Sequence, residues 1–131
     1  MRRFDCRELT AIYVGGAIGA IARVWLSQRY VQGGTSWPWT IFLINVTGSF
    51  LLGYFATRLQ ERLPQSTYRR PLLGTGFCGA YTTFSTMEVE ILKMVEANHY
   101  ALAISYAIVS LLAGLTAVWL ASTLVRRGRF T

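Results

Sequence analysis

The side chains of this chain that could do chemistry lie inside long apolar stretches. They are Arg23, Asn45 and the glycine- and hydroxyl-rich run at 74–87. Polar and ionisable groups are costly inside a membrane, so each is a functional candidate by default. His99, the single histidine, has no cysteine or carboxylate pattern beside it that would indicate a metal site or a catalytic triad. The sequence also has no phosphate-binding loop and no dinucleotide fingerprint, so we expect that the protein is not an enzyme.

Arg23 and Asn45 each allow two interpretations. Arg23 lies near the end of its apolar segment, where its side chain either snorkels to the membrane interface or provides a fixed positive charge that draws an anion toward a vestibule. Asn45 lies mid-segment, with Gly48 and Ser49 three and four residues later on the same helical face. It either hydrogen-bonds across helices, a contact worth about 1 kcal/mol, or lines a polar path.

The run at 74–87 also allows two interpretations. It holds three glycines followed by four hydroxyl residues in five positions, which makes a poor continuous helix. A break here would free main-chain carbonyls deep in the membrane, where they suit a hard cation such as Na⁺. The alternative is a kinked helix whose Ser and Thr side chains bond back to their own main chain.

The elements that must position these residues are four apolar segments, at 9–28, 39–57, 72–95 and 100–125. Each is long enough to cross a bilayer as a helix, which takes about 20 residues. They predict an all-α membrane protein in which residues 1–131 form a single four-helix domain. The segments are rich in glycine, which lets helices approach closely, and four helices alone leave little room for a pore, so we expect an oligomer.

Two further patterns accompany these segments. Tyr106, Ser110 and Gly114 form a polar stripe on the otherwise apolar fourth segment. Trp37 is one of several Trp and Tyr residues near segment ends, which we assign to the aromatic belts of a membrane protein.

The positive charge of the chain follows the segment ends. Of thirteen Lys and Arg residues, three lie at the N-terminus, four between the second and third segments and three at the C-terminus; they are Arg2, Arg3, Arg7, Arg58, Arg62, Arg69, Arg70, Arg126, Arg127 and Arg129. Nucleic-acid binding would need cations clustered on a folded face, so the net charge of +7 does not indicate it. The positive-inside rule predicts that both termini are cytoplasmic.

Three stretches carry longer motifs: 15–23 reads GGAIGAIAR, 45–53 reads NVTGSFLLG and 76–86 reads GFCGAYTTFST. In order and spacing they resemble the GGxxGAxxR, NxxGSFLLG and GFCGGxTTFST motifs of the CrcB/Fluc family of fluoride channels. The resemblance covers nearly the whole chain. It implies an antiparallel homodimer with two pores, inserted in both orientations into the inner cell membrane as a multi-pass protein.

The resemblance also implies roles for individual residues. A Na⁺ at the dimer centre would be held by the main-chain carbonyls of Gly79 and Thr82. Asn45 matches the pore asparagine and Phe84 the first of two pore phenylalanines, while Arg23 matches the vestibule arginine. The polar track of the fourth helix matches Tyr106 and Ser110. One position departs from the family pattern, because Met87 stands where the second phenylalanine is usual and a thioether lacks the electropositive edge of a ring.

Passive export of fluoride from the cytoplasm is the function that this resemblance implies. The Asn45 amide and the hydroxyls of Thr83, Ser85, Tyr106 and Ser110 could replace the water around the ion, and the edge of the Phe84 ring carries partial positive charge. The competing hypotheses are a small multidrug-type antiporter and a non-transporting membrane scaffold. The antiporter needs a carboxylate embedded in the first segment, where Glu8 lies only at the mouth.

Overall fold

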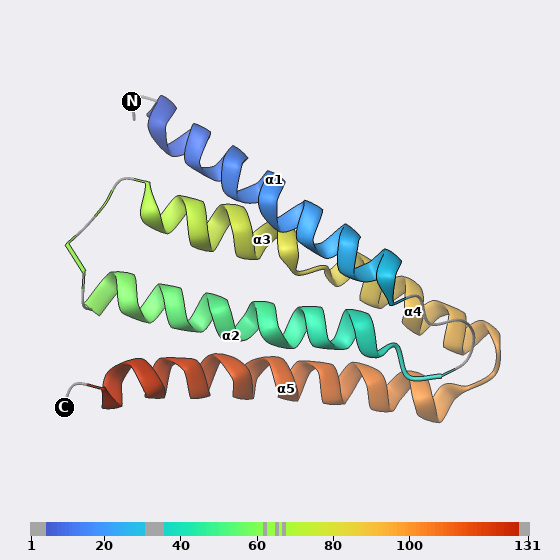
Figure 1. Cartoon of the computed structure of the whole chain (residues 1–131). Helices are drawn as coiled ribbons and strands as arrows, with labels where there is room; N and C mark the ends of the chain where they lie inside the picture. The colour runs from blue at the N-terminus through green and yellow to red at the C-terminus, as the bar shows by residue number, and fades with distance from the viewer. Residues whose placement is uncertain (1–4, 31–35, 62, 65, 67, 129–131) are drawn as a thin grey trace.

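The computed structural model describes residues 5–30, 36–61, 63–64, 66 and 68–128, and all regular structure within these ranges is helical. Its elements are α1 (Cys6–Arg29), α2 (Trp39–Glu61), η1 (Pro71–Cys78), α3 (Gly79–Tyr81), α4 (Phe84–Glu96) and α5 (Tyr100–Arg127) (Figure 1). η1 is a π-helix, whose turns are wider than those of an α-helix. The predicted all-helical fold is therefore confirmed.

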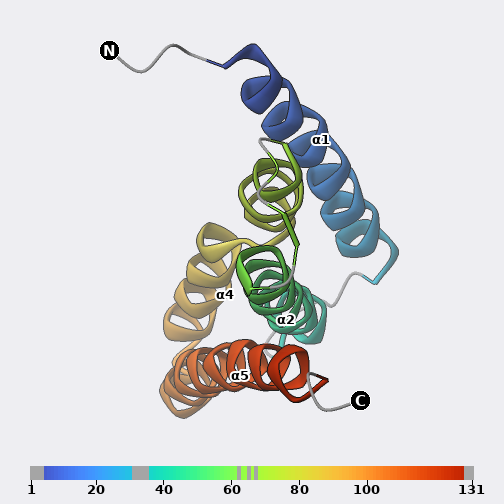
Figure 2. The ribbon, with the colours of Figure 1, turned by 90° about the vertical axis from the view of Figure 1, so that its left-hand side faces the viewer.

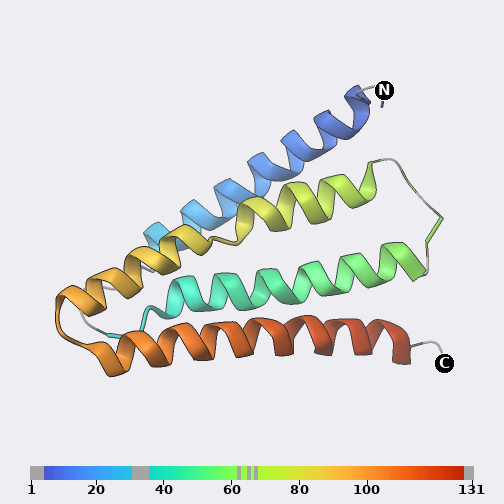
Figure 3. The ribbon, with the colours of Figure 1, turned by 180° about the vertical axis from the view of Figure 1, so that it is seen from behind.

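Three of these helices, α1, α2 and α5, are long and apolar enough to cross a membrane. The protein is therefore a multi-pass membrane protein. The segment predicted at 72–95 is divided among η1, α3 and α4, none of which is long enough alone. These three elements follow one another alongside α2 (Figures 1 and 3).

The helices form a layered arrangement with α1 at one end and α5 at the other (Figure 2). Over the described ranges, α1 packs mainly on η1, α2 packs mainly on α5, and α1 does not touch α5. The start of α1, the end of α2, the start of η1 and the end of α5 all lie at one end of the molecule (Figure 1). The described arginines of the predicted cytoplasmic set belong to this end, while Arg2, Arg3, Arg62 and Arg129 lie outside the described residues.

Glycines allow the close contact between α1 and η1. A Cβ atom on Gly15 would overlap the carbonyl oxygen of Leu72, and one on Gly19 would overlap the carbonyl oxygen of Phe77. Such close approach of two backbones is the role expected of a GxxxG pair in lipid, where the hydrophobic effect between helices is weak. The pair therefore places η1, and the segment that follows it, directly against α1.

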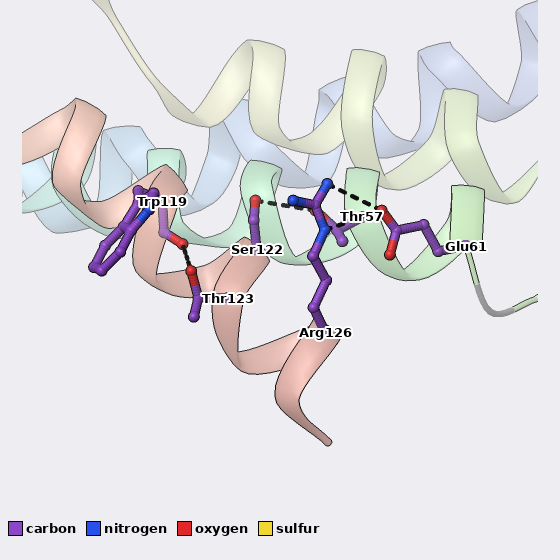
Figure 4. Close-up of polar contacts among 6 residues, drawn as sticks. All are labelled: Thr57, Glu61, Trp119, Ser122, Thr123 and Arg126. Atoms are coloured by element: carbon purple, nitrogen blue, oxygen red, sulfur yellow. Dashed lines mark hydrogen bonds and ion pairs between the residues drawn. The ribbon is translucent and has the colours of Figure 1, made fainter. Parts of the chain in front are cut away.

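Polar contacts join α2 and α5 at the arginine-rich end (Figure 4). The Thr57 hydroxyl donates to Ser122 Oγ at 3.0 Å. One turn further, the Nε and Nη2 atoms of Arg126 both lie 3.0 Å from Glu61 Oε1. Thr57 is buried and the ion pair is at the surface, so a buried hydrogen bond is followed by a charged contact near the ends of the two helices.

A small hydrophobic core lies where α4 meets α5 at the opposite end. Met94, Ala103 and Tyr106 form its buried centre. The partly buried side chains packed around them are Trp37, Phe42, Met87, Ile91 and Leu102. This core fixes α4 on α5 and so positions the residues that follow the end of α3.

Candidate functional site

Two residues with extended backbone separate α3 from α4. Thr82 has φ −75° and ψ 153°, and Thr83 has φ −145° and ψ 112°. The ribbon leaves its helical course at this point (Figure 3). α4 then begins at Phe84 with Thr83 as its N-cap, since the Thr83 hydroxyl accepts a hydrogen bond from the Thr86 N–H at 3.2 Å. The extended residues lie within the run at 74–87, which the sequence identifies as a poor helix.

Asn45 of α2 binds this extended segment through both ends of its amide. Its Nδ2 donates to the Thr83 carbonyl at 3.0 Å, and its Oδ1 accepts from the Thr83 N–H at 2.8 Å. In a continuous α-helix that N–H would donate to the carbonyl four residues earlier, at Gly79. Asn45 therefore supplies hydrogen bonds that the helix would otherwise provide. The amide has a second N–H that remains for another acceptor.

Arg23 of α1 also reaches the extended segment. Its Nη1 donates to the Thr82 carbonyl at 3.5 Å, and the residue is half-buried. Arg23 lines a cavity of about 470 Å³ together with residues from the end of α1, the start of α2 and one face of α4. Of the two interpretations of this arginine, the contact with Thr82 favours a charge held at the edge of a cavity.

Thr83 of the extended segment and the hydroxyl residues that follow it, Ser85 and Thr86, line the same cavity. Thr83 is 5% exposed, and its Oγ1 donates to Thr86 Oγ1 at 3.0 Å and lies 3.3 Å from Ser85 Oγ. Glu90 and Lys93, one and two turns along α4, complete this wall and form an ion pair of 3.4 Å. The cavity is thus lined by six hydroxyl residues, three of them Thr83, Ser85 and Thr86, together with a carboxylate and two cations, with Arg23 as the second cation.

Tyr106 and Ser110 lie one turn apart on α5, away from the cavity wall formed by Thr83. Tyr106 is fully buried at 0% exposed. By hydrogen-bond geometry neither its hydroxyl nor that of Ser110 has a partner among the residues that the structure describes, although the two hydroxyls are close enough to interact with each other. A buried hydroxyl normally has a partner, so these two groups are suited to bind a ligand or water.

Phe84 and Met87 have different surroundings, although they lie three residues apart on α4. Phe84 is 71% exposed, so its ring lies on the surface of the single chain. Met87 packs against the core around Tyr106. The structure of one chain therefore brings Asn45, Thr83 and Arg23 together, but leaves Phe84 outside this group.

Several site residues were not singled out from the sequence. Lys93 pairs with Glu90 at the cavity, and the Tyr81 hydroxyl lies 3.1 Å from Thr47 Oγ1. Trp37, assigned from the sequence to an interfacial belt, packs on Tyr106, a contact that the sequence did not indicate. The position of a tryptophan near a segment end gives no sign of this contact, because its partner is far along the chain.

These features define a class of protein: a multi-pass, all-helical membrane protein with polar groups gathered at a non-helical point between helices. The described residues include no group of three or more His, Cys, Asp or Glu side chains that could hold a metal ion. Its polar groups are mainly hydrogen-bond donors and fixed charges, which suit the binding of an ion.

Comparison with known proteins assigns the family. The sequence profile described as "CrcB-like protein, Camphor Resistance (CrcB)" matches residues 10–122. A protein of Mycolicibacterium paratuberculosis named fluoride-specific ion channel FluC 1 is 57% identical over 129 residues, which cover 98% of each chain. One of Acidobacterium capsulatum named fluoride-specific ion channel FluC is 43% identical over 113 residues, 83% of this chain and 88% of its own. The chain belongs to the CrcB family.

Proposed function

We propose that this protein is a fluoride-selective channel that exports fluoride passively from the cytoplasm. The observation that carries the proposal is the set of donors and positive charge gathered around Thr83 in an otherwise apolar chain, with two buried hydroxyls on α5 that lack partners among the described residues. The names of the relatives give the ion. A channel of this kind transports an ion without changing it, so the protein is not an enzyme.

The chemistry of the site fits a small, strongly hydrated anion. Fluoride loses water on entering a membrane, and amide and hydroxyl donors can replace that water. Arg23 and the positive end of the α4 macrodipole, which begins at Thr83, offset the cost of a negative charge in a medium of low dielectric. A membrane potential that is negative inside then favours exit, by about 2.3 kcal/mol per charge per 100 mV.

The interrupted segment is proposed as the fourth membrane crossing. η1, α3 and α4 run together beside α2, whose length suits a span (Figure 1). Irregular backbone is tolerated in a membrane only where protein or a polar cavity satisfies it, and here Asn45 and Arg23 bond to Thr83 and Thr82. The cavity beside Thr83 is then the vestibule through which the ion enters or leaves.

A homodimer is part of the proposal because one chain leaves the site incomplete. Phe84 exposes most of its ring, which a second copy would cover and so bring its electropositive edge to the ion path. We propose the antiparallel, dual-topology arrangement in the inner membrane that the family resemblance implies. The arginine-rich end favours cytoplasmic termini, so the copy of opposite orientation inserts against this preference, and contact between the copies must outweigh it.

The proposed dimer centre includes Na⁺ bound by main-chain oxygens. Gly79 is exposed. In a continuous helix its carbonyl would accept a hydrogen bond from the Thr83 N–H, but here that N–H donates to Asn45. The Thr82 carbonyl provides the second oxygen, which also accepts a hydrogen bond from Arg23. Main-chain carbonyls fit a hard monovalent cation, and since one chain offers only two of them, a second copy would complete the set. When bound, the cation would supply fixed positive charge near the anion path.

Efflux from liposomes tests the proposal directly. Purified protein in liposomes loaded with fluoride should release it at a rate far above that of protein-free liposomes, and should release chloride negligibly. A fluoride electrode and a chloride electrode measure the two rates. A scaffold would release neither ion, and equal release of both would contradict selectivity. The antiporter needs a carboxylate deep in the first helix. It is disfavoured because the acidic residue of α1 is Glu8, in the first turn at the mouth of the helix.

Replacement of Met87 tests the role proposed for this position. We expect Met87→Phe to keep fluoride efflux within about threefold of the wild type, because the ring restores an electropositive edge and a partly buried site tolerates a modest volume change. Met87→Leu, which keeps the volume without a ring or thioether, is the matched control. A folded but inactive Met87→Phe would mean that this side chain serves only the packing around Tyr106.

A further inference from the structure

Trp37 carries a buried N–H group that has no protein partner. Its Nε1 atom is buried and meets no hydrogen-bond acceptor in the part of the chain that the structure describes. The indole ring lies edge-on to Tyr106, with centroids 5.3 Å apart and planes at 86°, and edge-on to Phe42 at 5.5 Å. Packing explains why a large ring is present here, but a phenylalanine would pack without leaving a buried donor unpaired.

The unpaired donor belongs to a group of three. Across the described ranges, the buried side-chain polar atoms without a partner are Trp37 Nε1, Tyr106 Oη and Ser110 Oγ. Tyr106 contacts Trp37 and lies one turn from Ser110, so all three belong to one region between the start of α2 and α5. Unpaired buried polar groups are costly, and three in one place indicate a ligand or water rather than chance.

The chemistry of the three groups points to an acceptor. An indole N–H donates and cannot accept, whereas the two hydroxyls can donate as well as accept. A ligand that only accepts hydrogen bonds can therefore satisfy all three groups, because each of them can donate, and an anion is the simplest such ligand. The residue after Trp37, Pro38, lines the cavity with Arg23, so Trp37 adjoins a residue of the cavity wall and packs on Tyr106.

We infer that the Trp37 indole N–H is a third donor on the anion path, which receives the ion between the vestibule and the hydroxyls of Tyr106 and Ser110. This inference depends on the proposed channel function and adds to it a residue that selects for hydrogen-bond acceptors. It predicts that the indole N–H changes its environment when fluoride binds, which a tryptophan used only for packing would not do.

Trp37→Phe removes the donor and keeps an aromatic ring. We expect fluoride efflux from liposomes to fall about ten- to a hundredfold, the usual effect of one lost hydrogen bond to a charged ligand. Trp119→Phe is the matched control, because Trp119 is 63% exposed on α5 and its loss should leave efflux unchanged. Efflux by Trp37→Phe equal to that of Trp119→Phe would overturn the inference.

A spectroscopic measurement reads the same N–H without transport. The chain has four tryptophans, so ¹⁵N labelling gives four indole signals in detergent micelles. The Trp37 signal is assigned by its absence in Trp37→Phe or, if that variant does not fold, by elimination with the other three substitutions. We expect it to shift on titration with sodium fluoride but not with sodium chloride. Wild-type efflux without this shift would refute the inference alone, whereas absence of wild-type efflux would refute the channel function.

Discussion

Asn45→Asp should abolish fluoride efflux, because it removes a donor and adds a like charge at the point where Asn45 binds the extended segment. The Nδ2 atom donates to the Thr83 carbonyl at 3.0 Å, and a carboxylate oxygen in its place would repel that carbonyl. The acceptor for the Thr83 N–H would remain. An aspartate at the centre of a membrane helix costs about 2.5–3.5 kcal/mol, so we expect a loss of about a hundredfold or more.

Asn98→Asp is the matched control for this change. Asn98 is the other asparagine of the chain and lies in the turn between α4 and α5, where the same substitution changes charge at the surface. Its Oδ1 accepts a hydrogen bond from the Tyr100 hydroxyl, which an aspartate can also accept. Electrode measurements on liposomes that contain equal amounts of folded protein compare the two variants. Normal efflux by Asn45→Asp would remove Asn45 from the ion path.

Hydropathy predicts much of the fold because lipid imposes a simple rule. A spanning helix satisfies its own main-chain groups and must be apolar, so α1, α2 and α5 are visible as apolar segments. Hydropathy does not mark where such a helix ends. α2 continues to Glu61 and α5 to Arg127, beyond the predicted 57 and 125, and Glu61 pairs with Arg126 in these last turns. A charged residue ends an apolar segment of the sequence but does not end the helix.

The local structure around the site depends on partners far away in the sequence. The run at 74–87 indicated a weak helix, but its extended residues, Thr82 and Thr83, are held by Asn45, which lies 38 residues before Thr83. The sequence left Asn45 as either a contact between helices or a residue of a polar path. In the structure its amide makes an interhelical contact with Thr83, which lines the cavity, while Asn45 itself is not among the lining residues, so its place on a polar path stays a prediction.

The surroundings of the remaining candidates depend on how the helices pack, and the spacing of residues in the sequence does not reveal this packing. Phe84 and Met87 are one helical turn apart, yet one ring is largely exposed while the thioether packs near Tyr106. Trp37 occupies a segment end, where an interfacial role is the usual one, but its ring meets Tyr106 from the fourth apolar segment. The first outcome depends on how α4 packs on α5, and the second on how the start of α2 packs on α5.

Gly19→Ala should destabilise the protein strongly, because α1 and η1 touch through their backbones. The added Cβ would overlap the Phe77 carbonyl oxygen and lie 3.1 Å from both the Phe77 carbonyl carbon and the Tyr81 nitrogen. These are main-chain atoms of η1 and α3, which cannot move aside as a flexible side chain can. Overpacking costs about 1–3 kcal/mol where side chains can adjust, so we expect a loss of stability at or above the upper end of this range.

Gly16→Ala separates this contact from a general effect on the helix. Gly16 lies on the same helix, and an added Cβ would sit 3.8 Å from the Gly76 carbonyl oxygen and 4.0 Å from Ala80 Cβ, both ordinary contacts. Alanine also favours helix over glycine, so Gly16→Ala should unfold in denaturant no earlier than the wild type. The two variants are compared by unfolding in detergent and by fluoride efflux.

Since α3 directly precedes Thr82, displacement of η1 and α3 by Gly19→Ala should also move the Thr82 carbonyl away from Arg23 and reduce efflux in the protein that still folds. Equal stability of the two variants would mean that η1 does not lie against α1 as described.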